Sequence, residues 1–146
     1  MKLTLILADW AQVINGKLYV MGGGWSETGP APTPSALAAI IEVPWDETNR
    51  KHPVKFQLVD SDGQPVMVVA PTGPQPVVVA TEFDVGRPPG VNPGTSFNVP
   101  MALNFGPLPL PPGKEFVWRC SIDDRSDEAW AVTFRTRSVQ PQQLTL

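Results

Sequence analysis

Alternation of apolar and polar residues along most of the chain is the feature that most constrains its fold. The run KEFVWRCSI carries apolar side chains at every second position, and the run AWAVTFRT does the same. A period of two places such residues on one face of a β-strand. We therefore predict strands whose inward-facing residues are Phe116, Trp118, Cys120 and Ile122; Trp130, Val132 and Phe134; Leu3, Leu5 and Leu7; Leu37, Ala39, Ile41 and Val43; Val54, Phe56 and Leu58; Val77, Val79, Thr81, Phe83 and Val85; and Phe97, Val99, Met101, Leu103 and Phe105.

Short runs rich in Gly, Pro, Asn and Asp separate these predicted strands. Asn15-Gly16 predicts a two-residue type I′ hairpin, in which both central residues have positive φ. Residues 60–63 and 123–127 predict two further hairpin tips. The segments GPAPTP, APTGPQP, GRPPGVNPG and GPLPLPPG are predicted to be longer crossovers between sheets. Pro100 lies within a strand pattern and predicts an edge or bulged strand, because proline donates no ladder hydrogen bond.

The expected fold follows from many short strands and almost no helix. One helical turn at most is predicted, near residues 44–50, where Pro44 and the acidic residues after it suit a helix start. The chain shows no internal repeat, and 146 residues suit one core. We therefore predict an all-β, single-domain antiparallel β-sandwich of the immunoglobulin-like kind that spans residues 1–146.

Charge and cysteine content exclude several classes of function. The formal net charge is -3, and Arg50-Lys51 is the only pair of adjacent basic residues, so we expect no nucleic-acid partner. The single cysteine, Cys120, excludes an internal disulfide and a thiolate metal cluster. The apolar run at the amino end stops at Asp9, too early for a membrane span, and lacks the cleavage region of a signal peptide. We expect a cytoplasmic or virion-borne protein with no membrane partner.

Three consecutive glycines, residues 22–24, raise the question of a phosphate-binding loop. A Walker A loop needs Lys and then Ser or Thr after its second glycine, but Pro30 and Ala31 follow Gly29. The dinucleotide-binding pattern fails as well, because Glu27 stands where its third glycine would be. No helical pattern opens there to present amides to an anion. We predict instead that the glycines end a strand and bend the sheet.

Little in the chain predicts catalysis. His52 is the only histidine, and its neighbours Lys51 and Pro53 favour an exposed histidine in a turn. Cys120 falls on the inward face of a predicted strand, which favours a buried, unreactive thiol. We therefore predict no catalytic residue and a protein that is not an enzyme.

A calcium site is one alternative. Asp60-x-Asp62-Gly63 resembles the start of a calcium loop, but no glutamate follows at the closing position. Further acidic residues would join it if the two predicted hairpin tips were adjacent; these are Asp123, Asp124, Asp127 and Glu128. Because Asp and Gly also favour turns on conformational grounds, calcium at Asp60 and Asp62 is a hypothesis only, and no other cofactor is expected.

The five tryptophans suggest a binding surface. Trp118 and Trp130 alternate with core residues, whereas Trp10, Trp25 and Trp45 lie near predicted strand ends. These three either form a platform for a protein or a sugar, or cover the open ends of the sandwich. Our leading hypothesis is a non-enzymatic interaction or assembly module that binds a protein partner or itself at the end carrying Trp10, Trp25 and Trp45. The alternative is a small-ligand or carbohydrate-binding sandwich, assisted by calcium.

The chain as a whole resembles a family of uncharacterised bacterial proteins of similar length, largely actinobacterial and described as a domain of unknown function. The blocks that carry the resemblance are EVPWDETNRKH, ILADWAQVINGKLYVMGGGW, GRPPG and GPLPLPPGKEF. The resemblance implies no activity, cofactor or site residue. A structural role in a phage virion is an expectation by loose analogy with other small β domains.

Overall fold

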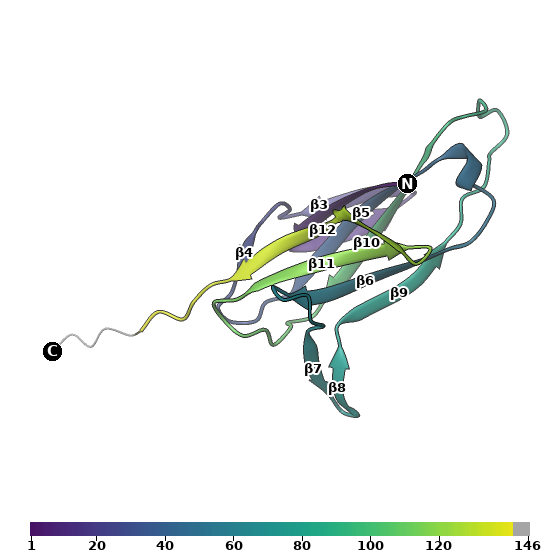
Figure 1. Cartoon of the computed structure of the whole chain (residues 1–146). Coiled ribbons are helices and arrows are strands. Elements are labelled where there is room, and N and C mark those ends of the chain that lie inside the picture. The colour runs from purple at the N-terminus through teal and green to yellow at the C-terminus, as the bar shows by residue number, and fades with distance from the viewer. Residues whose placement is uncertain (142–146) are drawn as a thin grey trace.

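Two β-sheets pack face to face in the computed structural model, which describes residues 1–141 (Figure 1). The smaller sheet has the order β1-β5-β10, with β1 at Lys2–Ala8, β5 at Ser35–Val43 and β10 at Phe97–Phe105. The larger sheet has the order β4-β12-β11-β6-β9, with strands at Glu27–Thr28, Arg125–Thr136, Glu115–Ile122, His52–Asp60 and Val78–Phe83. All pairings are antiparallel except the short contact of β4 with β12. The predicted all-β sandwich is confirmed and is compatible with an immunoglobulin-like arrangement.

Two small hairpins and one helical turn complete the described chain. The hairpins are β2 (Trp10–Ile14) with β3 (Lys17–Met21), and β7 (Met67–Ala70) with β8 (Gly73–Pro76). The helical turn is the 3-10 helix η1 (Trp45–Glu47), which begins after Pro44 as predicted. Among the described residues, no helix is long and apolar enough to cross a membrane.

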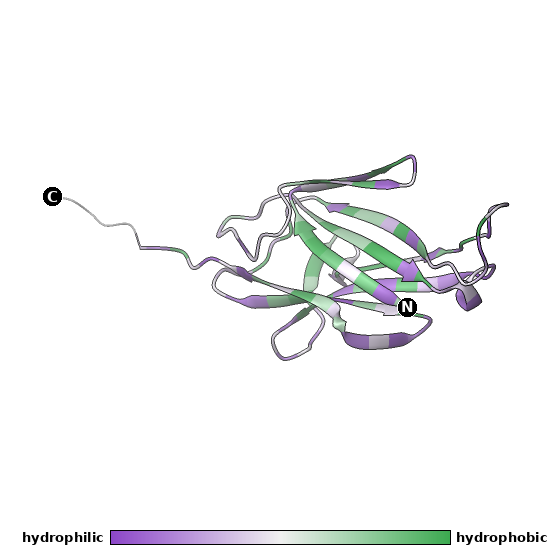
Figure 2. Cartoon of the chain, turned by 90° about the horizontal axis from the view of Figure 1, so that it is seen from above, coloured by the Kyte–Doolittle hydropathy of each residue, from purple (hydrophilic) through white to green (hydrophobic). Residues whose placement is uncertain are grey.

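The main core lies between the two sheets and confirms most of the predicted inward-facing residues. Figure 2 shows that the apolar residues are concentrated on the strands. Each strand with strict alternation buries its predicted face; the fully enclosed members include Leu7, Leu37, Ile41, Val54, Phe56, Leu58, Trp118, Cys120 and Ile122. Thr81 is the exception and is exposed, because β9 is the last strand of its sheet.

The turn chemistry is confirmed at two hairpins. Asn15 and Gly16 have φ of 50° and 72°, as a type I′ turn requires. Asp123 and Asp124 also have positive φ and join β11 to β12. Pro100 lies on β10, which pairs only with β5, so the prediction of an edge strand is confirmed.

Three of the four predicted crossovers connect the two sheets, and one does not. GPAPTP, GRPPGVNPG and GPLPLPPG each link a strand of one sheet to a strand of the other. The prediction for APTGPQP was wrong, because this segment forms most of the β7–β8 hairpin. Gly73, with φ of 115°, supplies the tight turn that the sequence pattern did not reveal.

A second, smaller core lies on the opposite face of the three-stranded sheet. It consists of Ala8, Ala11, Ala36 and Ala38, with Ile6, Leu18, Val20 and Ala102 packed against it. The β2–β3 hairpin supplies three of these residues, so it covers part of that face. Because alanine side chains are short, the hairpin backbone approaches the sheet closely, as the full burial of Ala11 shows.

The glycine run ends β3 and turns the chain, as predicted. β3 stops at Met21, and Gly22 and Gly24 have φ of 62° and 90°. A Cβ atom at Gly22 would lie 2.3 Å from Oδ2 of Asp9, so the Asp9 side chain would have to move, and the positive φ itself disfavours a larger residue. The Gly24 amide then donates to the Leu7 carbonyl at 2.7 Å, which fixes the departing chain against the end of β1.

We expect the replacement Ala38→Leu to destabilise the protein by about 1–3 kcal/mol, because extra methyl groups between β5 and the hairpin overpack this contact. Urea unfolding followed by tryptophan fluorescence measures the change. Ala80→Leu, on the exposed side of β9, is the matched control and should change stability by less than about 0.5 kcal/mol. Equal effects of the two substitutions would contradict a tight alanine contact.

Candidate functional site

An exposed apolar face of the β2–β3 hairpin is the strongest candidate for a functional surface. The cross-strand pairs Trp10–Met21, Gln12–Tyr19 and Ile14–Lys17 alternate with inward-facing pairs, so these six residues share one face. We call it the hairpin outer face. Its four large apolar side chains are substantially exposed: Trp10 49%, Ile14 43%, Tyr19 52% and Met21 66%. Soluble proteins seldom expose such a contiguous apolar group without a use.

The opposite face of the hairpin explains why the outer face points to solvent. Ala11 is fully buried, and Leu18 and Val20 pack with it against the alanines of β5. A slip of one residue would expose these three and bury Lys17. The orientation of the hairpin is therefore fixed by burial.

The two edges of the hairpin differ in hydrogen bonding. The two-residue turn makes Ile14–Lys17, Gln12–Tyr19 and Trp10–Met21 the hydrogen-bonded pairs, so the backbone groups of Ala11, Leu18 and Val20 point away from the partner strand. On the β2 side, the Asn104 amide caps Ala11: its Oδ1 accepts from the Ala11 N–H at 3.1 Å, and its Nδ2 donates to the Ala11 carbonyl at 2.7 Å.

The β3 edge has no comparable cap. Within residues 1–141, the N–H and C=O groups of Leu18 and Val20 form no hydrogen bond to the backbone or to a side chain. An uncapped strand edge is a template for an added strand. We call the backbone groups of Leu18 and Val20 the open β3 edge.

The three tryptophans predicted as one platform are not brought together. Trp10 follows the end of β1 at Ala8, whereas Trp45 follows the end of β5 at Val43. Because Ala8 pairs with Ala36 and Lys2 pairs with Glu42, these ends lie at opposite ends of the sheet. Trp10 belongs to the hairpin outer face, and Trp45 does not.

Trp45 and Trp25 both have packing partners in the chain. Trp45 stacks on Phe97, and the Arg87 guanidinium lies 3.8 Å from its ring centroid. Trp25 meets Phe134 edge to face, with centroids 5.7 Å apart, and its buried Nε1 finds no hydrogen-bond partner among residues 1–141.

Two hollows border Trp25. The narrower one offers about 30 Å³, which holds about one water molecule and not a small ligand. The wider one, of about 690 Å³, is an open depression that Asp9 and Arg137 also line.

His52 is fully buried, so the prediction of an exposed turn histidine was wrong. It lies on β6 in phase with Val54, Phe56 and Leu58, and it stacks on Phe83. The period of two that identified those residues extends back to position 52, and this signal was missed because Pro53 suggested a turn. Pro53 instead occupies the exposed side of the strand.

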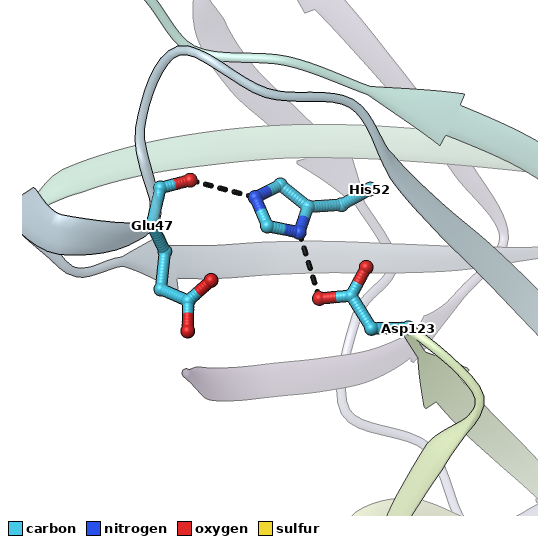
Figure 3. A group of neighbouring side chains, drawn as sticks. All are labelled: Glu47, His52 and Asp123. Carbon is cyan, nitrogen blue, oxygen red and sulfur yellow. Dashed lines mark hydrogen bonds and ion pairs between the residues drawn. The ribbon is translucent and has the colours of Figure 1, made fainter.

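The imidazole of His52 clamps three segments together. Its Nδ1 lies 2.7 Å from Oδ2 of Asp123, in the β11–β12 turn, and its Nε2 lies 2.7 Å from the backbone carbonyl of Glu47 in η1 (Figure 3). Both partners are acceptors, so the ring donates to both only when both nitrogens carry protons. Arg50 forms an ion pair with Glu47 and lies 3.9 Å from Asp123.

Glu47, His52 and Asp123 are the one group of three potential metal ligands in the described chain, with ligand atoms within 4.8 Å of one another. Their contacts favour a structural clamp over a metal site. Both His52 nitrogens already face oxygen atoms, and the Arg50 guanidinium supplies the positive charge that the carboxylates need. A cation at this place would have to displace the oxygen contacts of His52 and the Arg50 guanidinium.

The hypothetical calcium residues lie elsewhere. Oδ1 of Asp60 accepts hydrogen bonds from the amides of Asp62 and Gln64, both at 2.9 Å, which accounts for Asp60 as a turn residue. Asp60 pairs with Phe116, whereas the Asp123 amide donates to the Pro53 carbonyl. The two acidic tips therefore lie at opposite ends of β6 and do not combine. Calcium at Asp60 and Asp62 stays a prediction.

Cys120 lies in the core, as predicted. Its side chain is 2% exposed, and burial raises the pKa of the thiol from an ordinary 9.0 to about 12. Because the thiolate is the reactive form, the folded protein presents no nucleophilic sulfur near neutral pH.

We expect His52→Ala to destabilise the fold by roughly 2–3 kcal/mol, because two oxygen acceptors lose their donor and the stacking on Phe83 is lost. Chemical denaturation measures this. The neighbouring Lys51→Ala removes only an exposed ion pair with Glu82 and should cost less than about 1 kcal/mol. A His52→Ala protein as stable as the Lys51→Ala protein would exclude the clamp.

The Cys120 thiol should resist modification while the protein is folded. At pH 8 we expect a disulfide reagent to label it only after urea unfolding. Since the folded pKa is raised, this group stabilises the fold fully below pH 9 and loses that contribution as the pH rises towards 12. Rapid labelling of native protein at pH 8 would contradict the burial of the thiol.

Comparison of this chain with known proteins identifies its family and nothing further. No curated protein and no solved structure matches this chain. A family model with the description Family of unknown function (DUF6941) matches residues 3–135, which agrees with the resemblance to an uncharacterised domain. That match covers most of the 146 residues, and the chain belongs to this family.

Proposed function

We propose that this protein is a non-enzymatic interaction module that binds a protein partner through the hairpin outer face. One observation carries the proposal: four large apolar side chains are 43–66% exposed on one face of a hairpin whose other face packs on the three-stranded sheet. The β-structure holds these side chains in place before any partner arrives. Binding therefore costs little conformational entropy.

The chemistry of the hairpin outer face suits a protein partner. Tryptophan, tyrosine and methionine are enriched at the centres of protein interfaces, and lysine is depleted there. Because Trp10 and Tyr19 are about half exposed, together they can bury roughly 150–250 Å² on contact, a substantial part of the roughly 800 Å² that each partner contributes to a typical interface. Gln12 and Lys17 supply the polar positions of a rim.

The alternative of a small-ligand or carbohydrate-binding domain has less support. Trp10 and Trp45 lie at opposite ends of the sheet. Of the two hollows that Trp25 lines, one has room for about one water molecule and the other is an open depression rather than an enclosed pocket. The burial of His52 between Asp123 and Glu47 supports a structural role for that residue. We therefore retain the interaction module as the proposal.

The double variant Trp10→Ser/Tyr19→Ser tests the proposal. Cross-linking in an extract of the source organism, followed by quantitative mass spectrometry, identifies the proteins held by the wild-type chain, further copies of the chain included. We expect the variant to hold its partner at least ten-fold less, because truncation of two central aromatic residues removes typical hot-spot contacts.

Met67→Ser/Val69→Ser is the matched control, because it removes two exposed apolar side chains from the other hairpin, where they are 52% and 88% exposed. Both variants should retain the urea midpoint of the wild type. The hairpin outer face would be refuted as the binding surface by either of two results: the Trp10/Tyr19 variant keeps its partners, or both variants lose them equally.

A further inference from the structure

The hydrogen-bonding pattern of the β2–β3 hairpin indicates which partner it binds. On the β2 edge Asn104 caps the outward groups of Ala11, whereas on the open β3 edge neither Leu18 nor Val20 has such a cap in the described chain. We infer that the partner is a second copy of this chain, whose β3 pairs antiparallel with this β3 across a two-fold axis. This inference rests on the proposed function, since it names the partner of the same hairpin.

The register of such a pair follows from the backbone. Leu18 and Val20 have their N–H and C=O groups directed outward, and Tyr19 between them has its groups directed to Gln12. A two-fold axis at Tyr19 sets Leu18 of each copy opposite Val20 of the other. Each of these two pairs exchanges two hydrogen bonds, so four bonds form and each outward group of Leu18 and Val20 is used.

The side chains are compatible with this register. Tyr19 faces the Tyr19 of the second copy, and Lys17 faces its Met21, so no like charges meet. Lys17 is also the only charged residue of the hairpin in a protein of net charge -3. Two acidic molecules therefore meet where neither carries a carboxylate, and the aromatic pair adds apolar contact at the centre.

A second copy is favoured over an unrelated strand by self-complementarity. An unrelated strand has to match the open β3 edge in length and in the order of its groups, whereas an identical edge related by a two-fold axis matches both. The resulting sheet, with the order β2-β3-β3-β2, ends on both sides at a β2 edge where Asn104 caps Ala11, and this cap disfavours the addition of a further strand.

Disulfide trapping tests the inference at residue level. At a non-hydrogen-bonded antiparallel pair the Cα atoms lie about 4.5 Å apart, within the range that a disulfide spans. We expect Tyr19→Cys to form a covalent dimer under mild oxidation. Lys17→Cys is the matched control: the two positions 17 lie roughly 13 Å apart in this register and should not cross-link. Cys120 does not interfere because it is buried.

Light scattering across a wide concentration range supplies the second measurement. We expect the wild type to approach the mass of a dimer and Val20→Pro to dimerise at least ten-fold more weakly, because proline removes one outward N–H per copy. Val13→Pro is the control, since the backbone N–H of Val13 points away from β3, on the β2 edge of the same hairpin. The comparison requires that the two proline variants have the same urea midpoint of unfolding.

Two results would overturn the inference: a Tyr19→Cys chain that links no faster than Lys17→Cys, or a wild type that stays monomeric at every concentration. Either result refutes the second copy as partner through β3. The proposed function fails separately, only if the Trp10→Ser/Tyr19→Ser variant keeps the proteins that the wild type holds in the extract.

Discussion

Burial of β5 on both faces is the constraint on which the rest of the structure depends. One face carries Leu37 and Ile41, which fill the space between the two sheets, and the other carries Ala36 and Ala38, which the hairpin covers. Large residues on one side separate two sheets by about the usual 10 Å, whereas alanines on the other allow a much closer contact. The strand thus supports a full sandwich on one side and a thin third layer on the other.

The thin layer connects packing to the proposed function. Because Ala11, Leu18 and Val20 face the alanines, the alternate residues of the same strands must face solvent. The same geometry directs one hairpin edge to Asn104 and leaves the other open. The exposed aromatic residues and the unpaired backbone are both consequences of this docking of the hairpin against β5.

Much of the fold was predictable from the sequence, because a buried face leaves a period of two and a type I′ turn requires Asn-Gly. The strands around Phe56, Trp118 and Phe134 and the turn at Asn15 were found in this way. The burial of His52 was missed because Pro53 suggested a turn, although the period of two reaches position 52. Its partners, Asp123 and the Glu47 carbonyl, were not predictable, since they lie 71 and 5 residues away and spacing does not reveal them. The separation of Trp10 from Trp45 depends on strand pairing, which local patterns do not specify.

Amide hydrogen exchange, measured by NMR at increasing protein concentration, tests the central claim most directly. Gln12 and Tyr19 are bonded within the hairpin, so their amides should exchange slowly at every concentration. The amides of Leu18 and Val20 should exchange rapidly in dilute solution and become protected as the concentration rises. Rapid exchange of Leu18 and Val20 at all concentrations, or full protection in the dilute monomer, would contradict an open edge that a second copy occupies.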